Sequence, residues 1–437
     1  MNYKSFTIQN PWRSGKLQKD TSFPRAIFNA LLQSLDNKDI LILTGSRQVG
    51  KTTLLKSMIT KLLEQKTRPD SIFYFNLDDD SLHPYFEQYT DFISFINSEY
   101  KGFCYVFIDE IQRLKNPGIF LKLIHDLDMN LKIVVSGSSS LELKSKTTEH
   151  LTGRKRVFEL FPFSFSEYLS SRQNDFYLKK ELPDLIKYHH DDLNFQLFKF
   201  IIHGGYPKVL FAETDDEKEI ELKEIYDSYI KKDVKDFLNI DNINGYNNLV
   251  KAFAHQVGNL INYNEISNIS GLNIKTVMKY IDYLEGTYIF KRVPPWFQSS
   301  RKEISKAPKI FGFDTGLINY ITSHLNKELP DKGSIFENFV FSELTKHDLD
   351  IKFWRTGSGA EVDFIVNDIP IEIKSGILKK DSLTKSFSNF CKKYEPEKGF
   401  VFSNGFSGQR RFEKTTIYFF PLWAIPKVIF HFRGRSI

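Results

Sequence analysis

The chain has 437 residues, with 60 Lys and Arg against 54 Asp and Glu, so its formal net charge is only +6. At about 100 to 200 residues per domain this length predicts about three domains, and the 15% aromatic content excludes a disordered or fibrous chain. Two cysteines, Cys104 and Cys391, exclude a disulfide scaffold, and we expect both to be buried thiols. No secretory signal and no membrane-spanning apolar run is visible, so we expect a soluble, cytoplasmic protein without membrane contact.

Short apolar runs alternate with helix-length segments in the first third of the chain. The runs lie at residues 40–43, 72–75, 105–108 and 133–135. This alternation predicts a parallel α/β sheet with helices on both faces. Residues 163–237 are predicted to be mostly helical, and a compact helical segment is expected to follow to about Gly286. The last third of the chain is predicted to contain aromatic-rich strands and turns.

A phosphate-binding loop follows the first of these runs. Residues 45–52 read GSRQVGKT, which fits G-x-x-x-x-G-K-[ST] between an apolar strand and a helix. The glycines let backbone amides and a helix N-terminus face phosphates, while Lys51 reaches the β- and γ-phosphates and the Thr52 hydroxyl binds Mg²⁺. We therefore expect ATP to be bound by Gly45, Ser46, Arg47, Gln48, Val49, Gly50, Lys51, Thr52 and Thr53.

An acidic pair ends the third apolar run. Asp109 and Glu110 follow YVFI, 58 residues after Lys51. The first carboxylate is placed to hold the metal, and the second to orient or deprotonate the attacking water. Alone, the pair also fits a polar turn after a buried strand, but behind a phosphate loop it indicates Asp109 as a metal ligand and Glu110 as the catalytic base.

The two motifs and their order resemble the AAA+ ATPases, as Walker A and Walker B elements. In that family a third strand carries the sensor residue that touches the γ-phosphate. Here that strand reads KIVVSGSSS, and the resemblance points to Ser138 or Ser139. A serine-rich turn without a role in nucleotide binding fits the same residues equally well.

Later segments resemble a narrower group, the prokaryotic AAA+ ATPases fused to a C-terminal domain of unknown function. The shared segments include LTGR, LFPFSFSE, GGYP, FDTG, ENFV, EVDF and IEIK. The resemblance therefore covers nearly the whole chain. It implies a core at 1–162, a helical lid at 163–225, a winged-helix-like module at 226–296 and a restriction-endonuclease-like α/β domain at 297–437.

Two of these segments have both a catalytic and a structural interpretation. Arg154 or Arg156 can act as an arginine finger on a neighbouring subunit, which implies self-association. The alternative is a basic loop that neutralises nearby carboxylates. The GGYP turn resembles a nucleotide-sensing element in the lids of related ATPases, but Gly-Gly before Tyr-Pro is also an ordinary helix stop.

Residues 264–285, NEISNISGLNIKTVMKYIDYLE, predict a helix-turn-helix. Gly271 lies in the turn, Asn273 begins the second helix, and Ile274, Val277, Ile281 and Leu284 form the expected buried stripe. Lys275 and Lys279 are the basic groups that this helix offers to DNA. Two lysines neutralise at most about two phosphates, so a rigid spacer is the favoured interpretation over sequence-specific DNA reading.

The stretch EVDFIVNDIPIEIK predicts a β-hairpin in the C-terminal third. If Asn367-Asp368 is a two-residue turn, Val366 pairs with Ile369, and by the same count Asp363 lies opposite Glu372. Two facing carboxylates repel each other unless a positive group lies between them. Either a divalent metal or Lys374 supplies that charge.

The spacing of Asp363, Glu372 and Lys374 resembles the PD-(D/E)xK nuclease superfamily, although Val362 replaces the proline of that motif. The resemblance implies Mg²⁺ or Mn²⁺ bound by Asp363, Glu372 and Glu337, with Lys374 as a catalytic residue. The alternative is that Lys374 pairs with Glu361 or Glu372 on a solvated hairpin face.

Together these features predict an ATPase that uses ATP and Mg²⁺ and is coupled to a nuclease-like C-terminal domain acting on or binding DNA. The alternative is a nucleotide-controlled signalling or docking switch in which the nuclease-like domain is catalytically inactive. The net charge of +6 adds little to any DNA contact.

Overall fold

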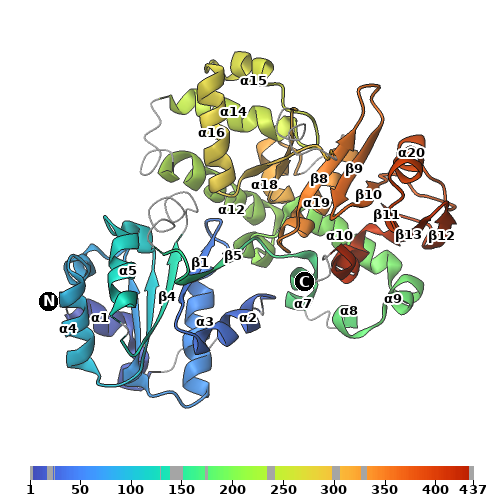
Figure 1. Cartoon of the computed structure of the whole chain (residues 1–437). Coiled ribbons are helices and arrows are strands. Elements are labelled where there is room, and N and C mark those ends of the chain that lie inside the picture. The colour runs from blue at the N-terminus through green and yellow to red at the C-terminus, as the bar shows by residue number, and fades with distance from the viewer. Residues whose placement is uncertain are drawn as a thin grey trace. The chain divides into compact units, whose positions relative to one another are not determined.

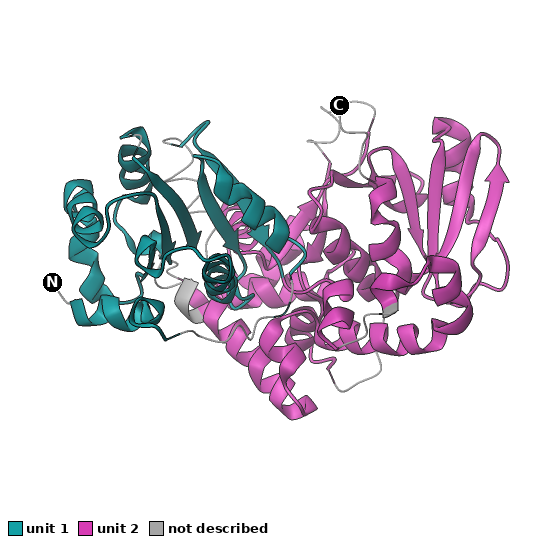
Figure 2. Ribbon diagram, turned by 90° about the horizontal axis from the view of Figure 1, so that it is seen from below, with its two compact units in different colours: residues 1–161 teal, residues 162–437 magenta. Residues whose placement is uncertain are grey.

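A computed structural model of the chain describes residues 3–16, 23, 25–127, 129–137, 151–172, 176–233, 242–297, 306–325 and 332–432. The chain divides into two units, residues 1–161 and 162–437 (Figure 2). The finer boundaries expected at 225/226 and 296/297 stay predictions.

The first unit is built on a five-stranded parallel sheet in the order β2-β3-β4-β1-β5 (Figure 1). Its strands are β1 Ile40–Gly45, β2 Ile72–Asn76, β3 Cys104–Asp109, β4 Leu131–Gly137 and β5 Lys155–Leu160. The first four are the predicted strands. β5 was not predicted because it is an edge strand with mostly exposed side chains, so its sequence lacks an apolar run.

Helices cover both faces of this sheet, as predicted. Figure 1 shows α1, α4 and α5 on one side and α2 and α3 on the other. Their bounds are α1 Tyr3–Gln9, α2 Phe28–Gln33, α3 Lys51–Glu64, α4 Tyr89–Glu99 and α5 Pro117–Asp126. Short 3-10 turns lie at η1 Pro11–Ser14, η2 Ser34–Asp36, η3 Pro69–Ser71, η4 Asp80–Phe86 and η5 Ile111–Arg113.

The second unit begins with helices, again as predicted. They are α7 Phe165–Ser171, α8 Phe176–Lys179, α9 Leu182–Tyr188, α10 His190–His203, α11 Pro207–Phe211, α12 Asp215–Asp227 and the π-helix η6 Ser228–Asp233. Three helices and a small antiparallel sheet follow: α14 Ile243–His255, α15 Tyr263–Ser270, α16 Ile274–Gly286, β6 Phe290–Val293 and β7 Lys309–Gly312, then α18 Thr315–Ile321.

The predicted helix-turn-helix is present as α15 and α16. Gly271 ends α15 with φ 67°, and the Asn273 side chain accepts a hydrogen bond from Thr276 N at 2.9 Å. Val277, Ile281 and Leu284 are buried, but the prediction for Ile274 was wrong, since it is 41% exposed. Ile274 lies in the first turn of α16, before the helix packs against its neighbours.

A six-stranded mixed sheet in the order β12-β13-β11-β10-β9-β8 forms the C-terminal part of the second unit. Its strands are β8 Ile351–Arg355, β9 Glu361–Val366, β10 Ile369–Ile373, β11 Lys398–Ser403, β12 Gly408–Phe412 and β13 Thr415–Pro421. Its helices are α19 Lys332–Thr345, α20 Lys385–Tyr394, α21 Ile425–Val428 and the 3-10 turns η7 Leu422–Ala424 and η8 Ile429–Phe432.

The β9–β10 hairpin has the predicted turn and register. Asn367 and Asp368 have φ values of 48° and 64°, and Val366 pairs with Ile369. The expectation of a solvated hairpin face was wrong for Glu372, which is only 4% exposed. β10 is a central strand of its sheet, and its residues from Pro370 to Ile373 are all buried, so both of its faces are covered.

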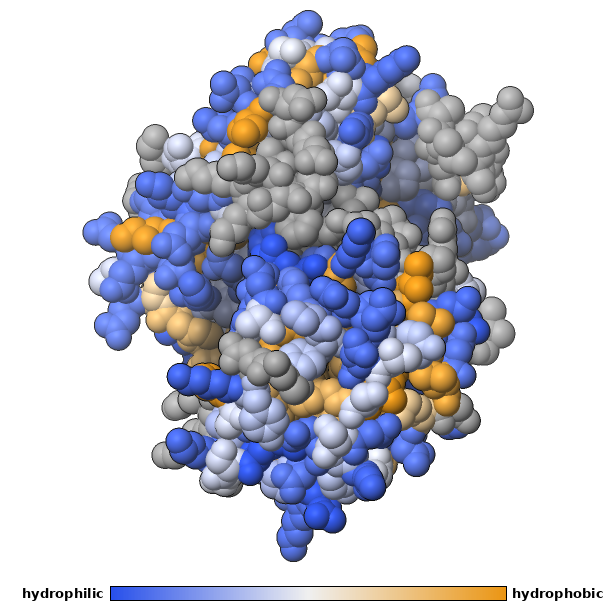
Figure 3. Space-filling view, turned by 90° about the vertical axis from the view of Figure 1, so that its left-hand side faces the viewer, coloured by the Kyte–Doolittle hydropathy of each residue, from blue (hydrophilic) through white to orange (hydrophobic). Residues whose placement is uncertain are grey.

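Two surface properties complete the description. Within the described ranges, no helix combines the length and apolar character needed to cross a membrane. The face in Figure 3 is mostly hydrophilic, with scattered hydrophobic residues.

Cys104 and Cys391 are both buried and unbridged, as expected, and burial raises the pKa of each thiol to about 11.

Candidate functional site

The phosphate-binding loop joins the end of β1 to the start of α3. Gly50 precedes the helix with φ 95°, in the left-handed region that glycine adopts readily. Gly45 is required for a different reason, because a Cβ there would lie 2.0 Å from the carbonyl oxygen of Leu160 in β5. The unpredicted edge strand therefore fixes the first glycine of the motif.

Polar groups inside the loop are positioned for an anionic ligand. Lys51 Nζ donates to the carbonyl oxygens of Gly45 at 3.0 Å and Ser46 at 2.7 Å, so the ammonium group lies within the loop. The Ser46 hydroxyl and Gln48 Oε1 are buried without a hydrogen-bond partner among the described residues. Buried polar groups normally have partners, so a ligand that supplies them fits this loop.

The remaining loop residues differ in their surroundings. Val49 is buried, Arg47 is half-buried and Thr53 is exposed. Arg25, which sequence reasoning did not single out, donates to Val49 O at 3.0 Å and to Phe161 O at 2.7 Å. Arg25 thereby ties the loop to the end of the first unit.

Asp109 is the centre of a buried hydrogen-bond cluster beside this loop. Thr52 Oγ1 donates to Asp109 Oδ2 at 2.6 Å, which joins the two predicted magnesium ligands. The Tyr74 hydroxyl donates to the same oxygen at 2.9 Å, and Ser136 Oγ donates to Oδ1. A hydroxyl and a carboxylate in contact are oxygen donors of the kind that Mg²⁺ takes, so the residues fit that ion.

Tyr74 and Ser136 were missed by sequence reasoning. Both lie inside apolar strands, where a tyrosine or serine is normally read as part of the core. Burial and the neighbouring Asp109 raise the pKa of Tyr74 well above its usual value, so its hydroxyl stays protonated and donates. No local sequence pattern marks these two residues. They can be identified once β2 and β4 are known to flank β3, the strand that ends in Asp109.

Glu110 has an unusual backbone conformation at the end of β3. Its φ is 57°, and its carboxylate accepts a hydrogen bond from Gln112 Nε2. Burial is the main cause of the raised pKa of Glu110; Lys51 opposes the shift, and Asp109 adds to it. A glutamate held in this way has the chemistry of a general base.

The two arginine-finger candidates are paired with acids of their own unit. Arg154 Nε lies 2.7 Å from Asp126 Oδ1, and Arg156 Nε lies 2.9 Å from Asp39 Oδ2. These contacts are those expected of a basic loop that neutralises carboxylates. The sensor candidates Ser138 and Ser139 lie outside the described residues.

The GGYP turn ends α10 and makes its contacts inside the second unit. Gly204 has φ 78°, Gly205 N donates to Asp314 Oδ2 at 2.6 Å, and Phe163 N donates to Gly205 O at 2.7 Å. Three of the segments that carried the family resemblance therefore meet at one place. Burial raises the pKa of Asp314, although backbone amides from Gly205 and Leu317 oppose that shift.

A buried lysine occupies the acidic cluster of the C-terminal sheet. Lys309, at the start of β7, is 2% exposed; its Nζ lies 2.5 Å from Glu361 Oε1 and 3.4 Å from Glu337 Oε2. Burial by itself lowers the pKa of Lys309, but Glu337 and Glu361 outweigh it and the net shift is upward. No sequence pattern singles out this residue, because a lysine at the start of a short strand is normally exposed to solvent.

The predicted C-terminal ligands are near one another but are engaged with protein groups. Lys374 Nζ lies 2.5 Å from Glu372 Oε1, and Asp363 Oδ2 accepts a hydrogen bond from Ile373 N at 2.6 Å. Burial and the Glu372 and Glu337 carboxylates raise the pKa of Asp363 well above its usual value. Across the part of the chain that the structure describes, no three Asp, Glu, His or Cys side chains are grouped as ligands of one metal ion.

Comparison with protein families divides the chain into three matched regions. Residues 37–169 match the family described as an AAA domain. Residues 194–328 and 332–425 match two families described as domains of unknown function, DUF8612 and DUF4143. The region that matches the AAA domain thus covers most of the first unit and extends a few residues into the second, and the two regions that follow match domains of unknown function.

Similar proteins span most of the chain. An uncharacterized protein of Haemophilus influenzae is 24% identical over 83% of this chain and 90% of its own length, and one of Methanocaldococcus jannaschii is 27% identical over 77% and 73%. A Walker-type ATPase of Pyrococcus abyssi matches 70% of this chain and 97% of its own at a TM-score of 0.44 and 14% identity. The Aeropyrum pernix ORC1 protein, solved in complex with DNA, matches 70% and 94% at 0.33 and 14%.

Proposed function

We propose that this protein binds ATP and hydrolyses it with Mg²⁺ at the carboxyl ends of β1, β3 and β4. The observation that carries the proposal is the contact between Thr52 Oγ1 and Asp109 Oδ2 at 2.6 Å, directly after the phosphate-binding loop. It joins the two motifs through the side chains that both need for one magnesium ion.

Each side chain has a distinct part in that reaction. The amides at the start of α3 and the Lys51 ammonium group bind the phosphates, and Lys51 exchanges the Gly45 and Ser46 carbonyls for phosphate oxygens. Thr52 and Asp109 hold the ion, which neutralises charge that develops on the phosphates. Glu110 accepts a proton from the attacking water or orients it.

Nucleotide binding and ATP turnover in two variants test this proposal. Lys51→Ala should abolish both, whereas Glu110→Gln should retain ATP and lose turnover. Lys61→Ala is the matched control, because that lysine is half-buried near the end of the same helix and pairs with Glu64 at 2.9 Å, away from the loop. ATP turnover that survives Lys51→Ala would refute the site.

An arginine finger remains part of the proposal. Arg154 would exchange Asp126 for the γ-phosphate of ATP bound to a second copy. Turnover per chain should then rise with protein concentration in the wild type and lose that dependence in Arg154→Ala. The same loss in Asp126→Ala, which only breaks the pair, would point to the local role.

For the C-terminal sheet, we favour a docking or switch role without nuclease catalysis. The observation behind this choice is that Lys309 pairs with Glu361 and Glu337, and Lys374 pairs with Glu372. A metal ion bound to Glu337 and Glu372 would have to displace both ammonium groups and break an ion pair of each lysine.

A metal-dependent nuclease is the second candidate. It is favoured by Glu372 Oε2, which is buried without a hydrogen-bond partner among the described residues and is therefore open to a ligand. Cleavage of labelled DNA with Mg²⁺ or Mn²⁺ separates the candidates. Cutting by the wild type and by Asp350→Asn, an exposed control, but not by Asp363→Asn would establish the nuclease, and absence of cutting supports the switch.

DNA binding without cleavage is a separate proposal for the same chain. It rests on Lys275 and Lys279, which are exposed on α16. Two phosphate contacts give a slope of about −2 in a plot of log affinity against log salt. A Lys275→Ala/Lys279→Ala variant should abolish that slope if α16 is the contact, and an unchanged slope would remove α16 from consideration.

A further inference from the structure

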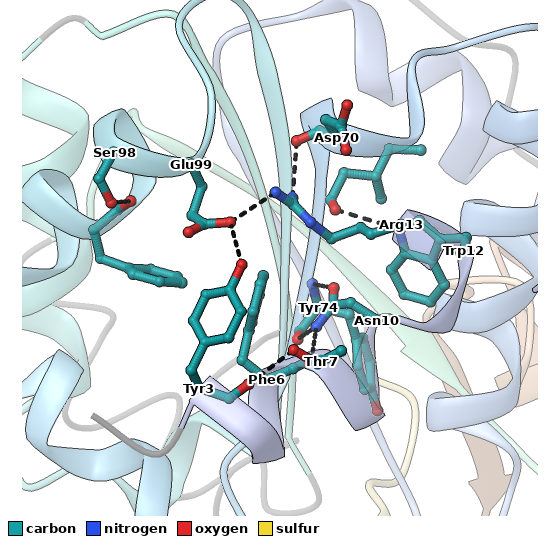
Figure 4. Close-up of polar contacts among 12 residues, drawn as sticks. Tyr3, Phe6, Thr7, Asn10, Trp12, Arg13, Asp70, Tyr74, Ser98 and Glu99 are labelled. Atoms are coloured by element: carbon teal, nitrogen blue, oxygen red, sulfur yellow. Dashed lines mark hydrogen bonds and ion pairs between the residues drawn. The ribbon is translucent and has the colours of Figure 1, made fainter. Parts of the chain in front are cut away.

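The outer edge of β2, which pairs with no strand of its sheet, is covered by side chains from residues 3–15, here called the N-terminal segment. β2 is the first strand of its sheet, so one row of its backbone groups lacks a neighbouring strand. Gln9 Oε1 accepts from Asn76 N at 2.8 Å, and Trp12 Nε1 donates to Ile72 O at 3.3 Å. Arg13 continues the row by donating to Asp70 O at 2.8 Å (Figure 4).

Asn10 makes the central contact of this row. Its Oδ1 accepts from Tyr74 N at 2.7 Å, and its Nδ2 donates to Tyr74 O at 2.8 Å. One side-chain amide thus replaces both hydrogen bonds that a paired strand would give to Tyr74. Asn10 is fully buried, so these bonds are shielded from water.

The far end of Tyr74 reaches the ATP site. Its side chain crosses the sheet from the Asn10 contact and places the hydroxyl 2.9 Å from Asp109 Oδ2, the oxygen that Thr52 also contacts. Asn10, Tyr74 and Asp109 therefore form a continuous path from the N-terminal segment to the predicted magnesium ligand. This path reaches the Asp109 carboxylate itself, whereas Gln9 contacts Asn76, which pairs with Asp109 in the β2–β3 ladder.

Two further contacts hold the segment in place. Phe6 lies in the core among aromatic residues, including Phe75 at a ring distance of 5.5 Å. Arg13 lies over the Phe73 ring at 4.7 Å and pairs with Glu99 at 2.9 Å, and the Tyr3 hydroxyl donates to the same carboxylate at 3.1 Å. Figure 4 shows Tyr3 and Arg13 converging on Glu99.

We propose that residues 3–15 are a positioning element of the ATP site, in which Asn10 fixes Tyr74 and the Tyr74 hydroxyl orients the Asp109 carboxylate for the metal. Tyr74 is thus a positioning residue that acts through Asp109. The inference rests on the proposed ATPase function, and it adds that metal affinity depends on a segment outside the two nucleotide motifs. Groups that orient a metal ligand are worth about 10- to 100-fold in affinity or activity.

A pair of matched Tyr→Phe variants tests the last step of the path. Tyr74→Phe and Tyr168→Phe each remove one buried hydroxyl that donates to a side-chain oxygen at 2.9 Å, but Tyr168 lies in the second unit and contacts Gln196, whereas Tyr74 contacts Asp109. Binding of a fluorescent ADP analogue is measured as Mg²⁺ is increased. Tyr74→Phe should raise the half-saturating Mg²⁺ concentration about tenfold, leave binding without Mg²⁺ unchanged, and differ from Tyr168→Phe, which should match the wild type.

The first step of the path is tested with Asn10→Ala against Asn319→Ala, which removes another buried side-chain amide bound to backbone, in the second unit. Asn10→Ala should raise the Mg²⁺ requirement, and the Asn10→Ala/Tyr74→Phe double variant should be no worse than Tyr74→Phe alone, because both act on one path. If thermal unfolding shows that Asn10→Ala does not fold, Asn10→Ser, which brings a hydroxyl and no charge into this buried site, takes its place.

The outcomes separate the two proposals. Equal Mg²⁺ requirements in Tyr74→Phe and the wild type, or the same shift in Tyr168→Phe, would overturn the positioning role while ATP binding stands. Failure of the wild type to bind the analogue, or unchanged binding in Lys51→Ala, would overturn the ATP site itself. Additive effects of the Asn10 and Tyr74 changes would remove the N-terminal segment from the path.

Discussion

Lys309 Nζ lies 2.5 Å from Glu361 Oε1, inside the acidic cluster in which the sequence predicts a divalent metal. The ammonium group is 2% exposed, and the Glu337 and Glu361 side chains are 19% and 25% exposed. A lysine therefore supplies the positive charge between these carboxylates, and it comes from β7, outside the motif that suggested the metal.

Lys309→Met should lower the free energy of unfolding by about 2–3 kcal/mol, less than for a fully buried pair because the acids are partly solvated. The change keeps the aliphatic volume but leaves Glu337 without the Lys309 ammonium group and leaves Glu361 with Arg355, 3.1 Å away. Urea unfolding measures the loss. Lys306→Met, at an exposed lysine three residues earlier, should be neutral; equal losses in both variants would contradict the role of the pair.

Ser136→Ala should weaken Mg²⁺-dependent nucleotide binding about tenfold. The Ser136 hydroxyl donates to Asp109 Oδ1, the oxygen opposite the one that Thr52 and Tyr74 contact. Titration of Mg²⁺ against a bound fluorescent nucleotide measures the change. Ser98→Ala, in which the lost bond is local to α4, is the control, and a wild-type Mg²⁺ requirement in Ser136→Ala would show that this donor is dispensable.

ATP turnover should decline on the acid side at a higher pH than an ordinary glutamate would produce. Burial raises the pKa of Glu110, so its carboxylate takes up a proton, and is lost as a base, above the usual value of about 4.3. A rate profile against pH measures the decline. ADP binding over the same range is the control, because it does not need the base; if binding declines in parallel, Glu110 is not the titrating group.

Stability should fall as pH rises through the raised pKa values of Asp314 and Glu343. Burial raises both, so the folded chain holds protons that the unfolded chain has already released, and the unfolding free energy decreases with pH above the usual carboxyl range. Thermal unfolding between pH 5 and pH 8 measures this slope. Glu343→Gln should flatten it, whereas Glu397→Gln should not; a slope unchanged by Glu343→Gln would contradict the assignment.

Gly45→Ala should destabilise the first unit severely. Its Cβ would lie 2.0 Å from a backbone oxygen in β5, which cannot move without breaking the β1–β5 pairing. Gly153→Ala is the matched control: its φ is also positive, at 75°, but nothing lies within 4 Å of the added atom. We expect about 1–2 kcal/mol for Gly153→Ala and loss of cooperative unfolding for Gly45→Ala; similar effects would show that backbone conformation alone matters.

The nucleotide motifs and most strands of the first sheet could be predicted because each is a local pattern. A loop of fixed spacing marks Lys51 and Thr52, and four apolar runs mark β1 to β4. The hydrogen-bond partners of Asp109 could not be predicted in this way. Tyr74 and Ser136 belong to neighbouring strands, and their roles depend on strand order, which the sequence does not state.

The C-terminal site illustrates the same limit of local patterns. The hairpin register follows from Asn367-Asp368 and is confirmed. The pairing of Lys309 with Glu361 could not be predicted from a local pattern, because Lys309 lies 52 residues before Glu361 and the two residues meet only in the folded chain. The sequence pattern therefore indicated the two strands and, as one alternative, the pairing of Lys374 with Glu372, but it did not indicate the lysine that faces Glu361 and Glu337.

The contacts of Asp314 and Glu343 bear on how the second unit can be divided. Asp314 accepts from Gly205 N, Asn319 Nδ2 donates to Ile201 O, and Glu343 accepts from Phe165 N. A fragment cut between residues 205 and 314, or between 165 and 343, keeps a buried acid while discarding one of the amides that donate to it. The helical stretch and the C-terminal part of the second unit thus share buried polar contacts that truncation removes, so this unit is better dissected by point substitution.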